Sequence, residues 1–168
     1  MDLTQEEVSK YGFHHWDLDT LAVISTFDEP ISKILVVGAH DEASANLFAE
    51  RGHEVWGIDL RPYDKSLSPC NYNFVQADFC DLPLEFTKKH LETFDVFVSI
   101  STMEHFGLGA YGEEPNKAFH DVVGMRKAWE FLKPGGRAYV TVPFGKEFFT
   151  TYPHWRVYDQ QSLLHRLV

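Results

Sequence analysis

Glu104 and His105 are the neighbouring side chains in this sequence best suited to proton transfer. They follow the apolar run "FDVFVSI", residues 94–100, which is typical of a buried strand. A histidine titrates near neutral pH, so His105 can take a proton from an attacking oxygen while the fold holds the reactants together. The alternative is that His105 only anchors its loop by hydrogen bonds. We predict a catalytic role for both residues.

Two aspartates end apolar runs and are placed to bind a nucleoside. Asp59 ends "EVWGID", about twenty residues after Gly38, a spacing at which a carboxylate accepts hydrogen bonds from ribose hydroxyls. Asp78 ends "NFVQAD" and precedes Phe79, so it can accept from an adenine amino group while the aromatic side chain covers the ring. The alternatives are a turn-capping role for Asp59 and a helix N-cap or turn role for Asp78.

Three further residues are candidates for holding a substrate. Tyr111 lies in "GLGAYGEEP", whose glycines are typical of a flexible substrate loop, although an ordinary surface connection has the same composition. His154 and Arg156 lie in "YPHWRVYD", ahead of the last predicted helix. Arg156 can bind a phosphate or carboxylate with two parallel hydrogen bonds; pairing with a local acid is its structural alternative.

These candidates depend on elements that bring them together, and the hydrophobic pattern predicts alternating strands and helices. Strands are predicted at 33–39, 54–59, 73–78, 94–100 and 136–143, and helices at 42–52, 84–94, 116–132 and 159–167. This alternation predicts an α/β domain with a mostly parallel sheet and helices on both faces, whose ligands bind beyond the carboxyl ends of the strands. The longest helix should present one apolar stripe to the core, made of Phe119, Val122, Met125, Trp129 and Leu132.

Residues 1–32 are predicted to form an N-terminal cap segment, and residues 33–168 a single domain. Thr4, with Glu7 three residues later, has the pattern of a capping box that opens a short helix. An irregular aromatic segment is expected after it. Within that segment His14, His15 and Trp16 either close over the site or, the more favoured interpretation, pack the segment onto the domain.

The charge balance and the cysteines restrict partners and compartment. Lys and Arg total 15 and Asp and Glu total 25, a net charge of −10 that repels a phosphate backbone, so we expect no nucleic-acid partner. Cys70 and Cys80 lack paired metal-ligand spacing and no secretion leader is recognisable, so we expect no metal, no disulfide framework and a cytoplasmic location. The longest apolar runs are too short to cross a bilayer, so no membrane partner is expected.

Five segments, taken in order, resemble the successive motifs of class I S-adenosylmethionine-dependent methyltransferases: "VVGAHDEA", "HEVWGIDLRP", "FVQADFCDLP", "FDVFVSISTMEHFG" and "FLKPGGRAYVTVP". The resemblance covers residues 33–143. It implies a Rossmann-like fold with strand order 3-2-1-4-5, S-adenosylmethionine as cofactor, and methyl transfer to a small-molecule substrate. The family's sheet normally adds a sixth and an antiparallel seventh strand, for which we expect no remaining sequence. Either the sheet is minimal, or another copy in a homo-oligomer covers its exposed edge.

The resemblance also implies a role for each residue of the cofactor site. Gly38, Ala39 and His40 would approach the methionine part, Asp59 and Leu60 would lie at the ribose, Asp78 and Phe79 at the adenine, and Ser99 and Ser101 along the pocket wall. The stretch "STMEHFGLGAYGEEP" is also similar to that of a poorly characterised subgroup associated with sugar and polysaccharide assembly. The acceptor implied by this narrower resemblance is an oxygen of a sugar-linked or related polar metabolite.

The loop after the first strand departs from the family pattern. An acidic residue and three alternating glycines are usual, but aligned without gaps this chain has Val36, Gly38, His40 and Glu42. A Cβ at His40 narrows the space or forces another loop path, and Asp41 or Glu42 brings negative charge to the helix start. The main alternative to an enzyme is therefore a methyltransferase-like binding or scaffold protein without catalysis. A pyrophosphate cofactor is disfavoured, because these acids would repel it, whereas S-adenosylmethionine carries no phosphate.

Overall fold

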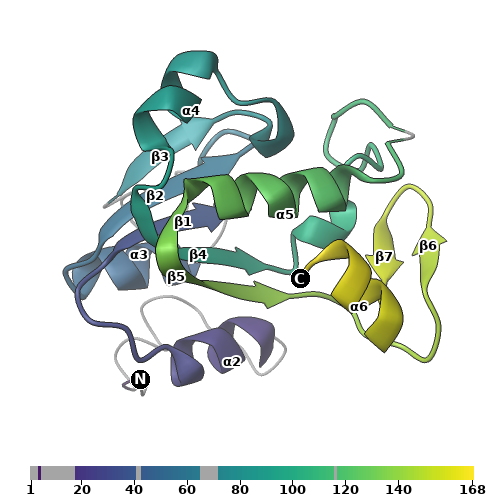
Figure 1. Ribbon diagram of the computed structural model, residues 1–168, viewed down its shortest axis with the longest axis horizontal. Helices are drawn as coiled ribbons and strands as arrows, with labels where there is room; N and C mark the ends of the chain where they lie inside the picture. Colours follow the sequence, from purple (N-terminus) through teal and green to yellow (C-terminus); the bar gives the residue numbers. More distant parts are fainter. Residues whose placement is uncertain (1–3, 5–17, 41–42, 65–71, 116) are drawn as a thin grey trace.

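A five-stranded parallel sheet forms the centre of the computed structural model, which describes residues 4, 18–40, 43–64, 72–115 and 117–168 (Figure 1). Its strand order is β3-β2-β1-β4-β5, and every neighbouring pair is parallel. The strands are β1 (Lys33–Val37), β2 (Glu54–Asp59), β3 (Asn73–Gln76), β4 (Phe94–Ile100) and β5 (Leu132–Thr141). The predicted Rossmann-like fold with order 3-2-1-4-5 is confirmed.

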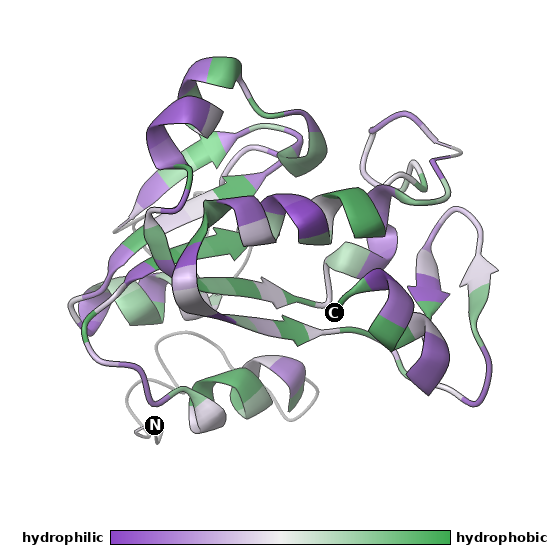
Figure 2. Ribbon diagram, in the orientation of Figure 1, coloured by the Kyte–Doolittle hydropathy of each residue, from purple (hydrophilic) through white to green (hydrophobic). Residues whose placement is uncertain are grey.

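Helices cover both faces of this sheet, because alternate side chains of a strand point to opposite sides. Ile34 and Val36 of β1 belong to a core cluster with residues of α2 and α3, whereas Leu35 and Val37 belong to a cluster with residues of α5. The central strands are accordingly coloured mostly as hydrophobic in Figure 2. The helices are α2 (Leu18–Thr26), α3 (Ala43–Glu50), α4 (Leu84–His90), α5 (His120–Phe131) and α6 (Gln160–Arg166), with the short turns η1 (Phe79–Asp81) and η2 (Met103–His105).

Two elements differ from the sequence-based expectations. Residues 18–26 were expected to be irregular but form α2, which buries Val23 and Ile24, with Phe27 buried just beyond its end. The short helix expected at Thr4 and the cluster of His14, His15 and Trp16 lie outside the described residues, apart from Thr4 itself, which is not helical. None of the helices in the described ranges has the length and hydropathy that crossing a membrane requires.

The second difference is an antiparallel hairpin of β6 (Phe149–Thr151) and β7 (Trp155–Val157), which we did not predict. It forms a separate two-stranded sheet and projects beside the loop that follows β4 (Figure 1). Among the described residues the central sheet has five strands, so the hairpin does not supply the sixth and seventh strands that are usual in the family. Its strands are only three residues long, which leaves little periodicity to recognise.

The apolar stripe predicted for the long helix was partly wrong. Met125 and Leu132 are buried as expected, but Phe119 is 65% exposed and Trp129 is 48% exposed. α5 instead buries Asp121, Gly124, Met125, Ala128 and Phe131. Because Asp121 and Gly124 stand on this buried face, the hydrophobic pattern alone predicts that a different face of the helix points to the core.

Asp121 is tolerated inside because its carboxylate is paired and hydrogen-bonded. The residue is 0% exposed and accepts from the Tyr158 hydroxyl at 2.9 Å, from Arg166 Nε at 2.7 Å and from Arg166 Nη2 at 2.7 Å. Burial and the nearby Asp121 carboxylate raise the pKa of Tyr158 far above its ordinary value, so this hydroxyl stays a donor. The cluster ties α6 to α5 and thereby closes one end of the core.

We predict that Asp121→Ala lowers the free energy of unfolding by about 3 kcal/mol, because Arg166 and Tyr158 would lose a buried charged acceptor. Tyr158→Phe should lower it by only about 1 kcal/mol, since it removes one hydrogen bond and leaves the ion pair in place. Urea unfolding of each variant measures both effects. Asp28→Ala, at a residue whose side chain is 76% exposed, is the matched control. A loss at Asp121 no larger than at Asp28 would contradict the structural role.

Candidate functional site

A cavity of about 310 Å³ opens at the carboxyl ends of the parallel strands, where ligands bind in sheets of this type. A volume near 300 Å³ is at the small end of the range for small-molecule sites. The cavity brings together eight of the predicted site residues: Gly38, Asp59, Leu60, Asp78, Phe79, Ser101, His105 and Tyr111. The other predicted residues are not among those that line it: Ala39, His40, Ser99, Glu104, His154 and Arg156.

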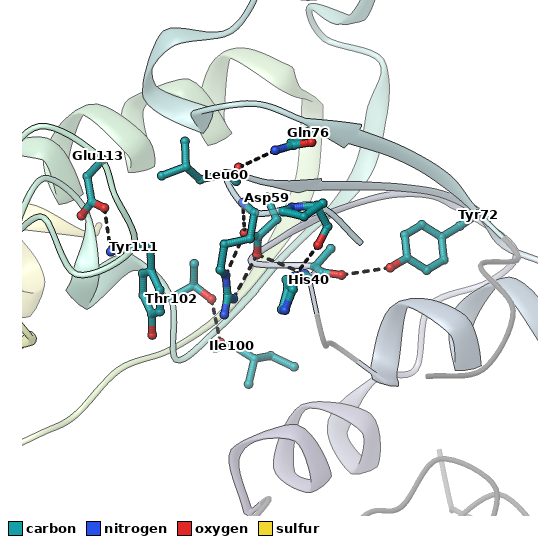
Figure 3. Close-up of polar contacts among 12 residues, drawn as sticks. His40, Asp59, Leu60, Tyr72, Gln76, Ile100, Thr102, Tyr111 and Glu113 are labelled. Atoms are coloured by element: carbon teal, nitrogen blue, oxygen red, sulfur yellow. Dashed lines mark hydrogen bonds and ion pairs between the residues drawn. The ribbon is translucent and has the colours of Figure 1, made fainter. Parts of the chain in front are cut away.

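Asp59, at the end of β2, presents a carboxylate that is already engaged by its own chain (Figure 3). Its Oδ1 accepts from the Arg61 backbone N–H at 2.8 Å and from Arg61 Nε at 3.2 Å. Its Oδ2 accepts from the His40 backbone N–H at 3.0 Å and lies 3.4 Å from Arg61 Nη2. The carboxylate therefore faces the cavity with the Arg61 guanidinium beside it.

The loop after β1 keeps its one glycine for a steric reason that the structure shows. Gly38 has φ +86°, a region that L-residues rarely adopt, and a Cβ there would stand 2.1 Å from Thr102 Oγ1. Thr102 is held in this position by donating to the Ile100 carbonyl at 2.8 Å. Gly38 thus allows the loops after β1 and β4 to approach each other at the cavity wall. Asp41 and Glu42, whose charge entered the sequence argument, lie outside the described residues.

The neighbours of Gly38 and Asp59 stabilise this corner of the site through the backbone. The Ala39 carbonyl accepts from the Tyr72 hydroxyl at 3.1 Å, and the Leu60 carbonyl accepts from the Gln76 amide at 3.2 Å (Figure 3). His40 Nδ1 contacts the Pro62 carbonyl, which turns its ring toward the following loop. The His40 side chain therefore attaches the loop to the Pro62 carbonyl, a contact that the glycine expected there could not make.

Asp78 and Phe79 both line the cavity and also make structural contacts within the protein. Asp78 Oδ1 accepts from the Cys80 backbone N–H at 2.8 Å and caps η1, the N-cap alternative considered for it, while the residue also lines the cavity. Phe79 is 3% exposed and its ring packs on Phe97 at 5.9 Å between centroids, so most of it belongs to the core. Burial raises the pKa of the Cys80 thiol to about 12, so this wall carries a neutral thiol.

The residues predicted to transfer protons, Glu104 and His105, lie within η2 and form a cluster with Ser101, which precedes it. Ser101 Oγ donates to Glu104 Oε1 at 2.6 Å, and His105 Nε2 lies 3.8 Å from the same oxygen. His105 Nδ1 contacts the His154 carbonyl, and because a carbonyl only accepts, Nδ1 carries the hydrogen and Nε2 is the basic nitrogen. His105 reaches the cavity, whereas Glu104 stands behind it and is 1% exposed.

Glu104 is a buried and incompletely paired carboxylate. Its Oε2 is inaccessible and has no hydrogen-bond partner among the described residues. Burial raises the pKa of Glu104 above its ordinary range, while the Ser101 hydrogen bond and the neighbouring His105 oppose that shift. Carboxyl groups whose pKa is perturbed by burial and a specific partner next to a cleft are candidates for functional sites.

Tyr111 is held over the cavity mouth by its own loop. Glu113 accepts from the backbone N–H groups of Gly109 at 2.8 Å and of Tyr111 at 3.0 Å. The Tyr111 ring meets the His105 ring edge-on at 5.2 Å, and the Arg61 guanidinium lies 4.5 Å from its centroid. The loop expected to bind substrate is therefore folded against both the proton-transfer cluster and Asp59.

Arg156 and His154 have a different setting from the one predicted for substrate residues. Arg156 is 1% exposed, and its guanidinium donates to the backbone carbonyls of Glu104, Phe106 and Lys117 at 2.8–3.3 Å. Its donors are thus used to hold the loop after β4 on the β6–β7 hairpin, and its Nε also lies 3.9 Å from Oδ1 of Asp121, the kind of acid pairing considered as its alternative. His154 contributes its carbonyl to His105 and has an exposed side chain outside the cavity lining.

Ser99 is also remote from the cavity surface, since it is 0% exposed and its Oγ lacks a partner within the described part of the chain. Several residues of the cavity lining were not predicted from the sequence, among them the polar residues Arg61, Thr102, Glu113 and His120. Arg61 follows Asp59 by two positions, a short range from which an ion pair could have been foreseen. The positions of Thr102 and His120 depend on contacts between distant segments, which leave no local signal.

Solved methyltransferase structures share this fold. A 1,6-didemethyltoxoflavin-N1-methyltransferase of Burkholderia thailandensis, with bound 1,6-didemethyltoxoflavin and S-adenosylhomocysteine, matches with TM-score 0.65 and 17% identity over 96% of this chain and 72% of its own. A SAM-dependent methyltransferase of Archaeoglobus fulgidus matches with TM-score 0.65 and 14% identity, over 98% and 72%. A TehB-like SAM-dependent methyltransferase of Corynebacterium glutamicum matches with TM-score 0.52 and 20% identity, over 79% and 65%. The fold is that of class I S-adenosylmethionine-dependent methyltransferases.

Within that fold class the sequence defines a narrower family. Residues 71–165, more than half of the chain, match the family model described as "Caenorhabditis protein of unknown function, DUF268". The chain belongs to this family. No curated protein matches the chain by sequence. The narrower resemblance to enzymes of sugar and polysaccharide assembly therefore stays a prediction.

We predict that Glu104→Gln makes stability less dependent on pH. Because burial raises the pKa of Glu104, the folded protein holds its proton at pH values where the unfolded chain, with a glutamate pKa of about 4.3, has lost it. The free energy of unfolding of the wild type should therefore fall as pH rises through this window, by up to about 1.4 kcal/mol per pH unit. The variant should lack this component.

Urea unfolding between about pH 5 and about pH 7 measures how the free energy of unfolding changes with pH in wild type and in Glu104→Gln. This range lies above the pKa of the glutamate in the unfolded chain. Glu85→Gln, at a side chain that is 91% exposed, is the matched control and should leave the slope of the wild type unchanged. An equal slope in wild type and Glu104→Gln would show that Glu104 titrates normally.

Proposed function

We propose that this chain transfers a methyl group from S-adenosylmethionine to an oxygen of a small polar acceptor. The observation that carries the proposal is one cavity at the carboxyl ends of the strands whose wall contains Asp59, Asp78 and His105 together. Two carboxylates suit a nucleoside, and an imidazole suits a hydroxyl that must lose its proton. The methyltransferase fold supports the same interpretation.

The cavity residues fit this cofactor in charge and position. Asp59 stands at the end of β2 and Asp78 just beyond β3, and both reach the same cavity, so one would accept from ribose hydroxyls and the other from an adenine amino group. Among the described residues, the cavity wall includes no glycine-rich pyrophosphate cradle, which a dinucleotide would need. S-adenosylmethionine, when bound, supplies an electrophilic methyl group on a sulfonium.

His105 is the proposed general base. Its Nε2 is the unprotonated nitrogen, since Nδ1 donates to the His154 carbonyl, so Nε2 can take the proton of an acceptor hydroxyl. The imidazolium formed would stand 3.8 Å from Glu104 Oε1, and its positive charge would favour the ionised form of this carboxyl, which in turn stabilises the imidazolium. Glu104 is therefore proposed to position and stabilise His105, with Ser101 fixing the carboxylate by its 2.6 Å hydrogen bond.

The acceptor is proposed to be sugar-linked or a related polar metabolite. Support comes from the resemblance of the stretch at 101–115 to sugar-assembly enzymes and from the polar groups around the cavity mouth. Tyr111 and Glu113 line that mouth next to His105, and the side chain of Tyr111 is an exposed aromatic ring of the kind on which sugars pack.

A binding or scaffold protein without catalysis is the second candidate. The observation that favours it is the Arg61 guanidinium, which contacts both carboxylate oxygens of Asp59 where ribose hydroxyls would bind. The two functions differ in whether the cavity takes the cofactor at all.

We predict that S-adenosylhomocysteine binds the protein with micromolar affinity and that Asp59→Asn weakens this binding by at least tenfold, about 1.4 kcal/mol. Asparagine keeps the size of the side chain but loses the charged acceptor. Isothermal titration calorimetry with S-adenosylmethionine and S-adenosylhomocysteine measures the affinity, and Asp28→Asn is the matched control. Absence of binding at millimolar ligand by folded protein would favour the scaffold function.

A second prediction concerns His105 and uses transfer of a labelled methyl group to a panel of nucleotide sugars. His105→Asn should reduce kcat about a hundredfold or more while leaving the affinity for S-adenosylhomocysteine within about threefold, because it removes the base and spares the cofactor contacts. Glu104→Gln should reduce kcat less and shift the pH–rate profile, as expected of a positioning residue. Equal loss of cofactor affinity and rate in His105→Asn would indicate a structural role instead.

A further inference from the structure

Asp59 has no acceptor position to spare for a ligand in the structure described. An ionised carboxylate offers about four lone-pair positions, two on each oxygen. Two are taken by the backbone N–H groups of Arg61 and His40, and two by Nε and Nη2 of the Arg61 side chain. A ribose diol could therefore bind Asp59 only by replacing one of these pairs of donors.

The four contacts are not equally strong. The backbone donors lie at 2.8 and 3.0 Å, whereas the guanidinium nitrogens lie at 3.2 and 3.4 Å, at and beyond the usual limit for such bonds. The backbone donors are also fixed by the fold, because they belong to the loops that follow β1 and β2. The Arg61 side chain is 32% exposed and contacts one position on each oxygen, which is the pattern that two neighbouring hydroxyls would match.

The Arg61 side chain has a second partner besides the Asp59 carboxylate. Its guanidinium lies 4.5 Å from the ring centroid of Tyr111, on the loop that Glu113 fastens by two backbone hydrogen bonds. This loop carries the predicted acceptor contacts and touches His105 through the Tyr111 ring. Arg61 thus links the nucleoside end of the cavity to its acceptor end.

We propose that the Arg61 side chain competes with ligands for the carboxylate of Asp59. A ligand with a vicinal diol must displace Arg61 from this carboxylate, and Tyr111 holds Arg61 in the competing position. The inference rests on the proposed function and adds a specificity rule to it. Only a ligand that brings two neighbouring hydroxyls replaces both guanidinium contacts, so ligands without the diol leave Arg61 in place. Displacement also breaks or rearranges the contact with Tyr111, so cofactor entry and the position of the acceptor loop are coupled.

The test compares two probes by calorimetry: S-adenosylhomocysteine and a synthetic analogue that lacks both ribose hydroxyls. A partly exposed ion pair is weak, so Arg61→Ala should tighten S-adenosylhomocysteine binding by about threefold to fivefold. Binding of the analogue should stay unchanged. Arg126→Ala removes the same charge at a side chain that is 83% exposed, on α5, and should change neither affinity.

A variant of Tyr111 tests the coupling. Tyr111→Leu should tighten S-adenosylhomocysteine binding less than Arg61→Ala does, and should add nothing when the two substitutions are combined. Additive effects would overturn the linkage between the two residues. Thermal unfolding of each variant verifies that the fold is retained.

A direct readout is the side-chain Nε–H resonance of Arg61, assigned by its loss in Arg61→Lys. Saturation with S-adenosylhomocysteine should shift this resonance strongly, and the diol-free analogue should not. An unchanged resonance at saturation, or equal affinities in wild type and Arg61→Ala, would overturn the competition while leaving the proposed function standing. Failure of S-adenosylhomocysteine to bind both proteins would overturn the proposed function, and this inference with it.

Discussion

Burial of a parallel sheet on both faces is the constraint from which the rest of this structure follows. Parallel strands are joined by crossover helices, so β1 and β4 lie under helices on either side and consist almost entirely of apolar residues. Polar side chains have little room within such strands and collect where the strands end. Asp59 and Ser101 accordingly stand at or just after the carboxyl ends of β2 and β4.

The same constraint makes buried charge costly, and two of the buried acids, Asp121 and Glu104, are compensated to different extents. Asp121 has two donors from Arg166 and one from Tyr158, so its charge is compensated and it serves to dock α6. Glu104 has one hydroxyl donor and an oxygen without a partner among the described residues. A carboxyl whose charge is incompletely compensated next to a cavity has a property that a positioned proton-transfer group can use. We therefore propose a functional role for Glu104 and a stabilising role for Asp121.

The loop after β1 shows how a site can keep its position while losing the usual residues. Gly38 is needed because its φ is positive and because Thr102 stands against it. Position 40, the next glycine position of the family pattern, tolerates a side chain, since His40 turns its ring to the Pro62 carbonyl while its backbone N–H donates to Asp59. The altered loop is thus built into the wall of the cavity and reinforces the carboxylate on which cofactor binding would depend.

The sequence by itself determined the positions of the main strands, because a buried strand needs a continuous apolar run that is visible locally, whereas the strand order was implied by the resemblance of the five motifs to the methyltransferase family. β2 and β4 begin and end where the pattern predicted. It also placed eight of its candidate residues around one cavity, since all parallel strands end at the same edge. The tertiary structure alone decided which side chains are used up by the protein. Arg156 donates to backbone carbonyls far away in the sequence, and α5 turns Asp121 inward. The contacts of Arg156 with these carbonyls, and those of Asp121 with Tyr158 and Arg166, join residues that are distant in sequence. The energies of such contacts depend on burial and geometry that residue types do not encode.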